Sequence, residues 1–349
     1  METPRSLGFR MPAEWESQEA VWLSWPTNPE TWPACWQSVQ HTFAEIAVQL
    51  SRFEEVCINL VEAKRPEIEG LLKRTEDHVG LARGSIRFFN HPTNDVWVRD
   101  HGPIYLKNDE SGEVALSHWG YNGWGEKYPY DLDRQIPALI ANSTGLRCFR
   151  QDLVLEGGSV DSNGAGDLLV TTDCLLNPNR NPGVSQEAIE ARLREGLGIE
   201  RVHWLEACIE GDDTDGHIDN LARFFKKDGV LVAACDRRDD SQFEMLARLE
   251  EQCRELELVG GGSLEVLNLA LPEPVFDEGR RLPMSYANFL IAQGVVLIPS
   301  FGQSDRDSEA ASKIRQAFPG REIVSINCQN LILEGGALHC LTQQVPQAS

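Results

Sequence analysis

Three segments of the chain carry the residues best suited to chemistry, and each contains glycine. The first, residues 211–220, holds His217 and Asp219. If this segment is an extended strand, the two side chains project from the same face, because residues i and i+2 of a strand share a face. A histidine titrates near neutral pH and can transfer protons, so His217 is a candidate general acid and base. A loop whose aspartates cap backbone amides is the alternative interpretation.

The second segment, residues 94–103, places Arg99 and Asp100 where a predicted strand ends at a Gly-Pro turn. Two interpretations of this pair are open. Arg99 and Asp100 could form an ordinary surface ion pair, which contributes about 0–1 kcal/mol to stability. Alternatively, Asp100 points into the mouth of a site, where its free carboxylate accepts hydrogen bonds from a ligand.

The third segment, residues 333–344, contains Cys340, which follows a Gly335-Gly336 turn and precedes a polar Thr-Gln-Gln run. A nucleophilic cysteine needs a neighbour that stabilises its thiolate or removes its proton. The adjacent His339 is a poor candidate, because neighbouring side chains of a strand point to opposite faces. His217, which is distant in the sequence, is therefore the expected partner of Cys340.

Together, these segments offer one cysteine, one histidine and several carboxylates to a common site. A carboxyl or amide substrate would need hydrogen-bond donors for a developing oxyanion, and carboxylates do not supply them. A planar cation presents two rows of N–H donors, which flanking carboxylates accept in pairs. The residue types therefore favour a guanidinium group as the ligand.

Short apolar runs bounded by Gly, Pro, Asn and Asp predict the strands that position these segments. The runs lie at residues 56–61, 86–89, 96–98, 168–172, 230–234 and 295–299. Helical periodicity between them predicts helices at residues 36–53, 186–197, 241–256 and 308–318. Alternating strands and helices indicate the α/β class. An apolar run ending in Glu-Gly-Gly occurs at 153–158 and again at 331–336, which hints at pseudo-symmetry with glycine turns at equivalent places.

Composition narrows the class of partner and the compartment. The chain has 349 residues with 32 Lys+Arg and 54 Asp+Glu, and its net charge is −22. This charge argues against nucleic acid or an anionic membrane as a partner, and no apolar run approaches the ~20 residues of a membrane helix. The nine cysteines are odd in number and form no Cys-x-x-Cys pair. We therefore expect reduced thiols, no structural zinc and a cytoplasmic protein.

These motifs, with others along the chain, resemble the agmatine deiminases and the related bacterial peptidylarginine deiminases of the guanidine-modifying superfamily. The resemblance covers nearly the whole chain. It rests on residues 11–15, 25–26, 97–103, 121–125, 156–158, 176–182, 213–220 and 335–344. It implies the pentein fold, a five-bladed pseudo-symmetric α/β propeller, and a single catalytic domain spanning residues 1–349.

The resemblance also implies catalytic roles. Cys340 matches the nucleophile that attacks the guanidinium carbon, and His217 matches the general acid and base. Asp100 and Asp219 match the two carboxylates that grip the guanidinium nitrogens. Glu156 matches a carboxylate near the histidine, which it is expected to orient.

Two further residues match the substrate-binding positions of the family. Trp97 matches an aromatic residue beside the substrate, and Asp213 matches an acid in the loop that contacts agmatine. The run Glu334-Gly335-Gly336-Ala337-Leu338-His339-Cys340 departs from the Gly-Gly-Gly-Asn-Ile-His-Cys toward which agmatine deiminases tend. We expect such departures to affect how the substrate's tail is recognised, and to leave the reaction type unchanged.

The implied activity is hydrolysis of agmatine to N-carbamoylputrescine and ammonia through a covalent amidino-cysteine, with no metal or organic cofactor. The expected partner is thus a small cationic guanidine, and homo-oligomer formation is left open. The first alternative is conversion of peptidyl-arginine to citrulline. More remote alternatives are a non-catalytic acidic protein that binds polyamines or other cations, and a papain-like thiol hydrolase, whose Cys-Gly-Ser-Cys-Trp signature is absent.

Overall fold

The computed structural model describes residues 2–348, and its main strands form five units built on one plan. In each unit two strands pair antiparallel, and a helix then leads to a third strand that pairs parallel with the second. The first unit consists of β5 (Ile104–Asn108), β6 (Val114–Gly120), α5 (Ile136–Thr144) and β7 (Arg147–Val154), with β1 (Phe9–Arg10) on its edge.

The next three units repeat this order of two strands, a helix and a strand. They consist of β8 (Asp161–Ser162), β9 (Asp167–Thr171), α7 (Gln186–Leu197) and β10 (Arg201–Leu205); of β11 (Ala222–Lys226), β12 (Gly229–Ala234), α8 (Phe243–Glu255) and β13 (Glu265–Ala270); and of β16 (Leu290–Ala292), β17 (Val295–Ser300), α9 (Ser304–Ala317) and β18 (Glu322–Asn327). A short hairpin, β14 (Phe276–Asp277) and β15 (Arg280–Arg281), connects the third unit to the fourth.

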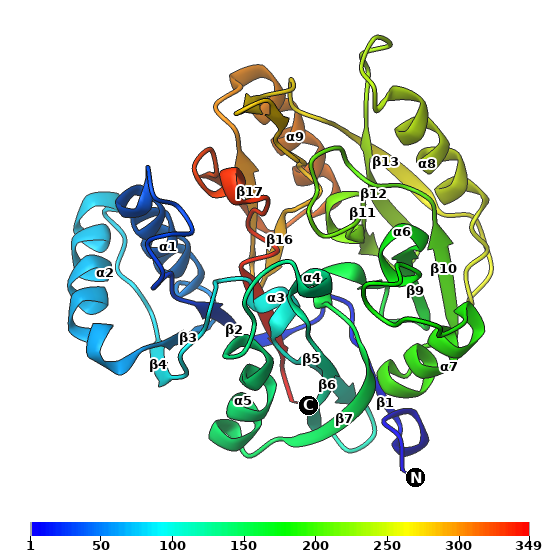
Figure 1. Cartoon of the computed structure of the whole chain (residues 1–349), viewed down its shortest axis with the longest axis horizontal. Coiled ribbons are helices and arrows are strands. Elements are labelled where there is room, and N and C mark those ends of the chain that lie inside the picture. Colours follow the sequence, from blue (N-terminus) through cyan, green and yellow to red (C-terminus); the bar gives the residue numbers. More distant parts are fainter. Residues whose placement is uncertain (1, 349) are drawn as a thin grey trace.

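The fifth unit is built from both ends of the chain. β19 (Thr342–Pro346) pairs antiparallel with β2 (Gln18–Ser24), and α1 (Trp36–Leu50) leads to the parallel strand β3 (Glu55–Leu60). α2 (Arg65–Val79) then adds a fourth strand, β4 (Ile86–Asn90). Figure 1 shows the long helices around the outside of the ring. The predicted α/β class and five-bladed pentein propeller are confirmed.

Most of the long elements follow from their apolar patterns. α7 occupies the predicted range, and it begins where the Ser185 side chain accepts a hydrogen bond from the Ala188 amide. It ends at Gly198, whose φ of 66° is readily adopted only by glycine. β17 carries a continuous run of four residues, Val295 to Ile298, that are at most 1% exposed. A strand of this kind is buried on both faces, which explains why its sequence is uniformly apolar rather than alternating.

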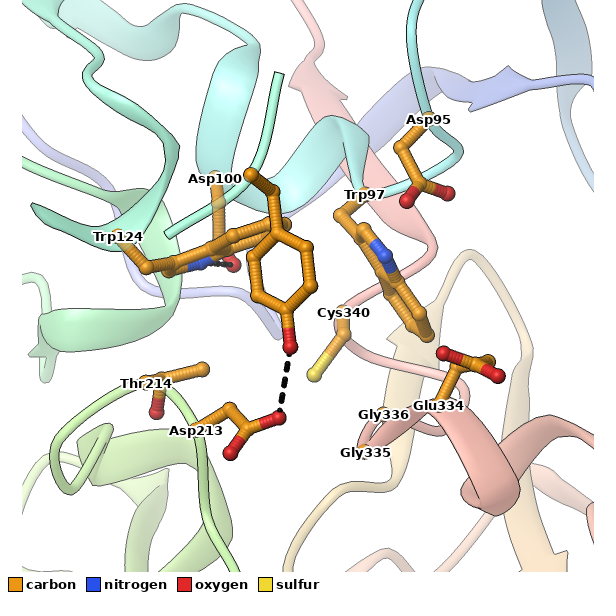
Figure 2. A pocket seen from close by; sticks show the side chains of 11 residues that line it. Asp95, Trp97, Asp100, Trp124, Asp213, Thr214, Glu334, Gly335, Gly336 and Cys340 are labelled. Atoms are coloured by element: carbon orange, nitrogen blue, oxygen red, sulfur yellow. Dashed lines mark hydrogen bonds between the residues drawn. The ribbon is translucent and has the colours of Figure 1, made fainter. Parts of the chain in front are cut away.

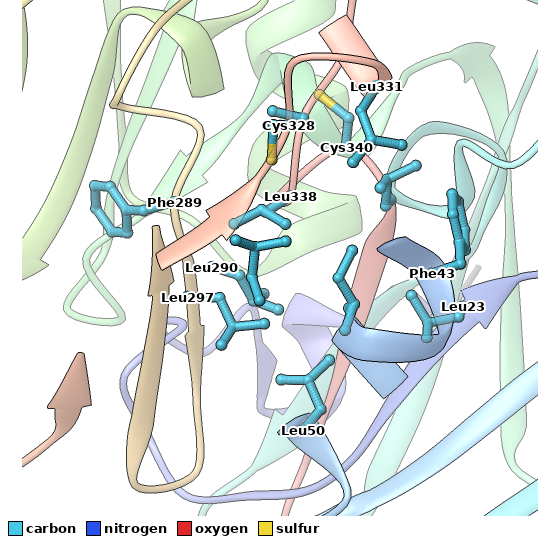
Figure 3. Close-up of a cluster of buried hydrophobic side chains, with 14 of the residues drawn as sticks. Leu23, Phe43, Leu50, Phe289, Leu290, Leu297, Cys328, Leu331, Leu338 and Cys340 are labelled. Atoms are coloured by element: carbon cyan, nitrogen blue, oxygen red, sulfur yellow. The ribbon is translucent and has the colours of Figure 1, made fainter. Parts of the chain in front are cut away.

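The largest apolar core joins the fourth and fifth units (Figure 3). Leu23 from β2, Leu50 from α1 and Leu297 from β17 are completely buried in it. Leu338 and Cys340, from the loop before β19, belong to the same cluster. The loop that carries the candidate nucleophile is therefore fixed by apolar packing on one side. No helix in residues 2–348 is long and apolar enough to cross a membrane.

Two local expectations are wrong. Residues 96–98 form no strand; the chain turns there into the short helix α3 (Val98–His101). His217 and Asp219 lie on no strand either, because residues Ile218–Asn220 form the 3-10 helix η5. Both Glu-Gly-Gly copies follow the last strand of a unit, but their conformations differ. The 3-10 turn η4 covers Gly157–Ser159 in the first copy, whereas η6 covers Leu331–Glu334 in the second.

Candidate active site

The candidate residues from distant parts of the sequence converge on one pocket (Figure 2). α3, the short helix α4 (Gly123–Glu126), the loop before η5 and the loop after η6 each contribute to its wall. The lining residues are Asp95, Trp97, Asp100, Trp124, Tyr128, Asp213, Thr214, Glu334, Gly335, Gly336 and Cys340. Asp219, His217 and Glu156 lie behind this lining and are completely buried.

The environment of Cys340 favours a neutral thiol. Its Sγ lies 3.5 Å from Oδ2 of Asp219, to which the thiol donates, and the Asn288 side-chain amide donates to the same sulfur at 3.1 Å. Burial and the charges of Asp219 and Asp100 raise the pKa of Cys340 well above its ordinary value. The amide of Asn288 opposes this effect, because it stabilises the thiolate, but it does not outweigh two carboxylates.

His339 orients Asp219 and does not serve Cys340 as a base. The segment is a turn and not a strand, and the imidazole is buried between two carboxylates. Its Nδ1 lies 2.8 Å from Oδ2 of Asp219, and its Nε2 lies 2.9 Å from Oε2 of Glu14. Burial alone would raise the pKa of Asp219, but His339, His217 and Arg223 together hold it below its ordinary value. Asp219 is therefore an ionised carboxylate beside the thiol.

Asp100 is also buried, so a surface ion pair with Arg99 is excluded. Arg99 points elsewhere, to the carbonyl of His339 and to the side chain of Gln344. The two oxygens of Asp100 accept hydrogen bonds from the Trp124 indole and from the Gly158 amide, both at 3.0 Å. Burial raises the pKa of Asp100 to about 6, although the nearby His217 opposes the shift.

His217 lies between two carboxylates, directly before η5. Its Nδ1 is 3.6 Å from Oδ1 of Asp100, and its Nε2 is 3.5 Å from Oε2 of Glu156. Within residues 2–348, neither ring nitrogen has a hydrogen-bond partner of good geometry. Burial disfavours the imidazolium, but Asp100, Cys174 and Glu156 outweigh that effect and hold the pKa of His217 well above its ordinary value. The ring is therefore protonated in the empty site and can act as an acid.

Glu156 is held in place from the side opposite His217. The Arg180 Nε donates to its Oε1 at 2.8 Å, and the Cys174 thiol approaches its Oε2 at 3.9 Å. Ligand atoms of Glu156, Cys174 and His217 lie within 4.8 Å of one another, a spacing that could hold a metal ion. The Arg180 guanidinium already occupies one oxygen of Glu156, so a cation lies beside the three ligand groups. A neighbouring cation disfavours a metal ion there, and the arrangement suits proton transfer by His217.

Glycine at position 158 permits the polar groups to approach one another. A Cβ atom at Gly158 would lie 2.6 Å from Nδ1 of His217, 2.8 Å from Oδ1 of Asp100 and 3.0 Å from Oδ2 of Asp219. Any side chain would thus displace groups on all three residues. The second glycine of the Glu-Gly-Gly motif is required by close packing and not by its backbone angles.

Trp97 and Asp213 stand on different walls of the pocket. A Cβ atom on Gly336 would lie 2.2 Å from the Trp97 ring, so this glycine admits the indole, which also packs against Trp32 at 5.9 Å between ring centroids. Asp213 Oδ2 accepts from the Tyr128 hydroxyl at 2.9 Å and from Arg280 at 3.2 Å. All seven residues predicted from the sequence therefore lie in or directly behind one pocket.

Several residues of this site were not predicted from the sequence. They are Cys174, Asn288, Tyr128, Trp124 and Glu334. Two of them carried a sequence signal: Trp124 stands between two glycines, and Glu334 begins the run that departs from the family pattern. In the structure Trp124 adopts a φ of 55°, in the left-handed region that non-glycine residues rarely occupy. The others are ordinary residues whose place in the site depends on tertiary contacts.

Comparison with known proteins gives a family match over nearly the whole chain. The family model of the Porphyromonas-type peptidyl-arginine deiminases matches residues 10–346. An agmatine deiminase from Pseudomonas aeruginosa (strain LESB58) is 36% identical over 371 aligned residues, which cover 99% of this chain and 97% of the relative.

Solved structures give the same result. An agmatine deiminase of Enterococcus faecalis superposes with a TM-score of 0.92 at 31% identity, covering 100% of this chain and 99% of that one. The C. jejuni agmatine deiminase with substrate bound superposes with a TM-score of 0.87 at 28% identity, covering 97% of both chains.

Proposed function

Because the chain belongs to the Porphyromonas-type peptidyl-arginine deiminase family, we propose that its pocket hydrolyses a guanidinium group, and that the substrate is agmatine. The protein is accordingly a hydrolase that acts on the C–N bond of a linear amidine. The products are N-carbamoylputrescine and ammonia. The proposal concerns which residues of this chain bind agmatine and which carry the reaction.

One observation supports the proposal most directly. Oδ1 of Asp219 is buried and has no hydrogen-bond partner among residues 2–348, while Oδ2 of the same carboxylate lies 3.5 Å from the Cys340 sulfur. A buried carboxylate oxygen without a donor is costly unless a ligand supplies one. A guanidinium N–H at this oxygen would place the guanidinium carbon next to the nucleophile. Asp100 lies within reach of the same ligand and would accept from its other nitrogens.

The first half of the reaction uses the site's own charges. The bound cation offsets the carboxylates that oppose thiolate formation, so the Cys340 thiol releases its proton to solvent as the cation binds. The thiolate sulfur then attacks the guanidinium carbon. A carbon–sulfur bond forms, and a tetrahedral adduct replaces the planar cation. His217, which is protonated in the empty site, gives its proton to a nitrogen of the adduct. The carbon–nitrogen bond then breaks, and ammonia leaves.

The second half returns the enzyme to its starting state. The covalent intermediate is an amidino group on Cys340, and His217 has lost its proton. The neutral imidazole removes a proton from water as the water oxygen adds to the same carbon. The carbon–sulfur bond breaks, and the hydroxyl proton of the adduct passes to the sulfur, which releases the neutral ureido product and restores the Cys340 thiol. Glu156 keeps the imidazole in place through both steps, and Arg180 fixes Glu156.

The pocket rim suits a small substrate. The Tyr128–Asp213 and Asp213–Arg280 hydrogen bonds, with a third from Arg280 to the Leu333 carbonyl, connect four parts of the chain. A slender alkylguanidine can pass such a rim, whereas peptidyl-arginine would need an open groove. Conversion of peptidyl-arginine is the alternative that the experiment must separate.

The test is ammonia release from agmatine, free arginine and a peptide with an internal arginine, each followed with mass spectrometry of the ureido product. We expect turnover of agmatine and a loss of at least about 10³-fold in Cys340→Ser, because removing a covalent nucleophile costs several orders of magnitude. Turnover of the peptide instead would establish the alternative activity. Undiminished turnover in Cys340→Ser would refute the covalent mechanism.

A further inference from the structure

The acidic residues of the pocket differ in whether another residue already binds them. Four carboxylates line the pocket, those of Asp95, Asp100, Asp213 and Glu334, and the lining contains no lysine or arginine. Asp100 lies deep and accepts hydrogen bonds from Trp124 and Gly158. The other three are less deeply buried than Asp100, and Glu334 is the exposed one among them, so the far end of a bound alkylguanidine could reach them.

Two of these three carboxylates are poor receptors for a further cation. Burial raises the pKa of Asp95 to about 7, so only about half of this group is ionised near neutral pH. Asp213 is paired with Arg280, and its Oδ2 accepts from both Arg280 and the Tyr128 hydroxyl. A second cation at Asp213 would have to share the carboxylate with an arginine.

Glu334 is different from both. It is solvent-exposed at the end of η6 and forms no ion pair among the described residues of the chain. Partial burial, with the charges of Asp213 and Asp277, raises the pKa of Glu334 above its ordinary value, and Arg280 opposes this shift. The Arg280 side chain already donates to Asp213 and to the Leu333 carbonyl. Glu334 is therefore the entrance carboxylate whose charge is not matched by a partner.

We propose that Glu334 determines specificity by binding the distal ammonium of an ω-aminoalkylguanidine, with the Trp97 ring as the wall for its methylene chain. This inference rests on the proposed deiminase function and assigns the tail of the substrate to a residue of this chain. In Figure 2 the Glu334 carboxylate lies beside the Trp97 ring, and Asp213 lies on the other side of Cys340.

The local backbone connects the two ends of the site. Glu334 ends η6, and Gly335 follows with a φ of 89°, which a residue with a Cβ rarely adopts. Gly336 is then pressed against the Trp97 ring, and the chain reaches the buried loop of Cys340. Glu334 and Cys340 thus belong to one short segment whose Cys340 end is packed and whose Glu334 end faces solvent. An ammonium at Glu334 and a guanidinium at Cys340 would be bound by the two ends of this segment.

The test compares agmatine with n-butylguanidine, which has the same carbon chain but no ammonium group. Dissociation constants are measured by calorimetry in the Cys340→Ser background, so that no turnover occurs. We expect Glu334→Gln to raise the dissociation constant of agmatine about tenfold, the weak end of what a charge-assisted hydrogen bond contributes. The dissociation constant of n-butylguanidine should change less than about twofold.

A matched control and a competing variant make the result decisive. Asp277→Asn removes one exposed carboxylate close enough to raise the pKa of Glu334 but outside the pocket lining, and it should leave both constants within about twofold. The proposal is overturned if Glu334→Gln weakens both ligands equally. It is also overturned if Asp213→Asn, and not Glu334→Gln, removes the preference for agmatine.

If the proposed deiminase function itself is wrong, the measurements differ from those expected when only the role of Glu334 is wrong. In that case the protein with Cys340 intact would release no ammonia from either guanidine. If only the role of Glu334 is wrong, ammonia release from agmatine persists with unchanged KM in Glu334→Gln. A thermal unfolding scan of each variant, compared with the parent, separates both outcomes from a folding defect.

Discussion

At the scale of single residues, the negative charge of a carboxylate lies beside the Cys340 sulfur, which in the proposed mechanism becomes a thiolate. Asp219 is held ionised by His339 and His217 while it accepts the Cys340 thiol proton in a hydrogen bond. The arrangement disfavours a reactive thiolate until a cation enters the pocket. A thiol of this kind is protected from oxidation and alkylation in the empty enzyme, because the thiolate is the nucleophilic form.

Alkylation of the free protein tests this conclusion. The rate of iodoacetamide labelling at Cys340, read by mass spectrometry of its peptide, should be low at pH 6 and rise about tenfold per pH unit beyond pH 8. The reason is that burial, Asp219 and Asp100 raise the pKa of Cys340 well above 9.0, so the thiolate fraction grows throughout this range.

The pH dependence of the labelling rate distinguishes a raised pKa of Cys340 from poor access of iodoacetamide to its sulfur. Poor access lowers the rate equally at every pH, whereas a raised pKa moves the midpoint. N-acetylcysteine is the reference, and its rate should level off near pH 9. Rapid labelling of Cys340 at pH 6, or a plateau reached below pH 8, would show that the free site stabilises the thiolate.

The chemistry of these residues was more predictable than their partners. Residue type and a neighbouring glycine singled out Cys340, His217 and Asp100 as candidates, because few side chains can act as nucleophile, proton carrier or anionic receptor. The hydrogen bond from His339 to Asp219 joins positions 120 apart in the chain, and that from Trp124 to Asp100 joins positions 24 apart. Such contacts depend on how the units pack, which local spacing does not encode.

At the scale of elements, short helices and turns hold the site, and long elements only position them. Asp100 lies in the four-residue helix α3, and Asp219 in the three-residue helix η5. A segment this short completes about one turn, so its apolar pattern cannot be distinguished from that of a strand. Residues 96–98 were therefore mistaken for a strand, whereas α7 was predicted with its correct ends.

Gly158→Ala tests whether the crowding around η4 is functional. The added Cβ would meet His217, Asp100 and Asp219 at 2.6 to 3.0 Å, so these groups must move apart. Misplacement of catalytic groups by about 1 Å can cost about 10²-fold in rate, and we expect at least this loss in kcat/KM for agmatine. Overpacking should reduce the free energy of unfolding by only about 1–3 kcal/mol.

The control is Gly70→Ala in α2, where the added Cβ would meet only the far end of the Arg74 side chain, at 3.4 Å. Alanine has the higher helix propensity, so stability should rise by up to about 1 kcal/mol while activity is unchanged. Activity of Gly158→Ala near that of the parent would mean that the three polar groups tolerate a wider spacing than their contacts indicate.

At the scale of the whole molecule, the ring of units is closed by its two ends. β19 completes the sheet that begins with β2, and it also lies against β5 of the first unit. Glu14, near the N-terminus, meets Arg223 of the third unit and His339 near the C-terminus in a buried network. The catalytic loop of Cys340 therefore depends on closure, because it leads directly into β19.

This closure predicts that the chain unfolds as one cooperative unit. Val345 in β19 is 6% exposed and packs with Trp22 and Tyr105, in a cluster shared by the fifth and first units. Val345→Ala removes two buried methyl groups, and we expect it to lower the free energy of unfolding by about 1–3 kcal/mol. A single calorimetric transition should shift to lower temperature by roughly 1–4 °C without splitting.

Val275→Ala, at a position that is 40% exposed, is the control and should leave the transition temperature within about 1 °C. If the ends of the chain formed a separate unit, Val345→Ala would instead produce a second, earlier transition while the rest of the chain kept its original one. Activity would then be lost at the earlier transition, because Cys340 precedes β19 by only two residues. A single shifted transition, with activity lost over the same temperature range, would show that the loop of Cys340 unfolds together with the rest of the propeller.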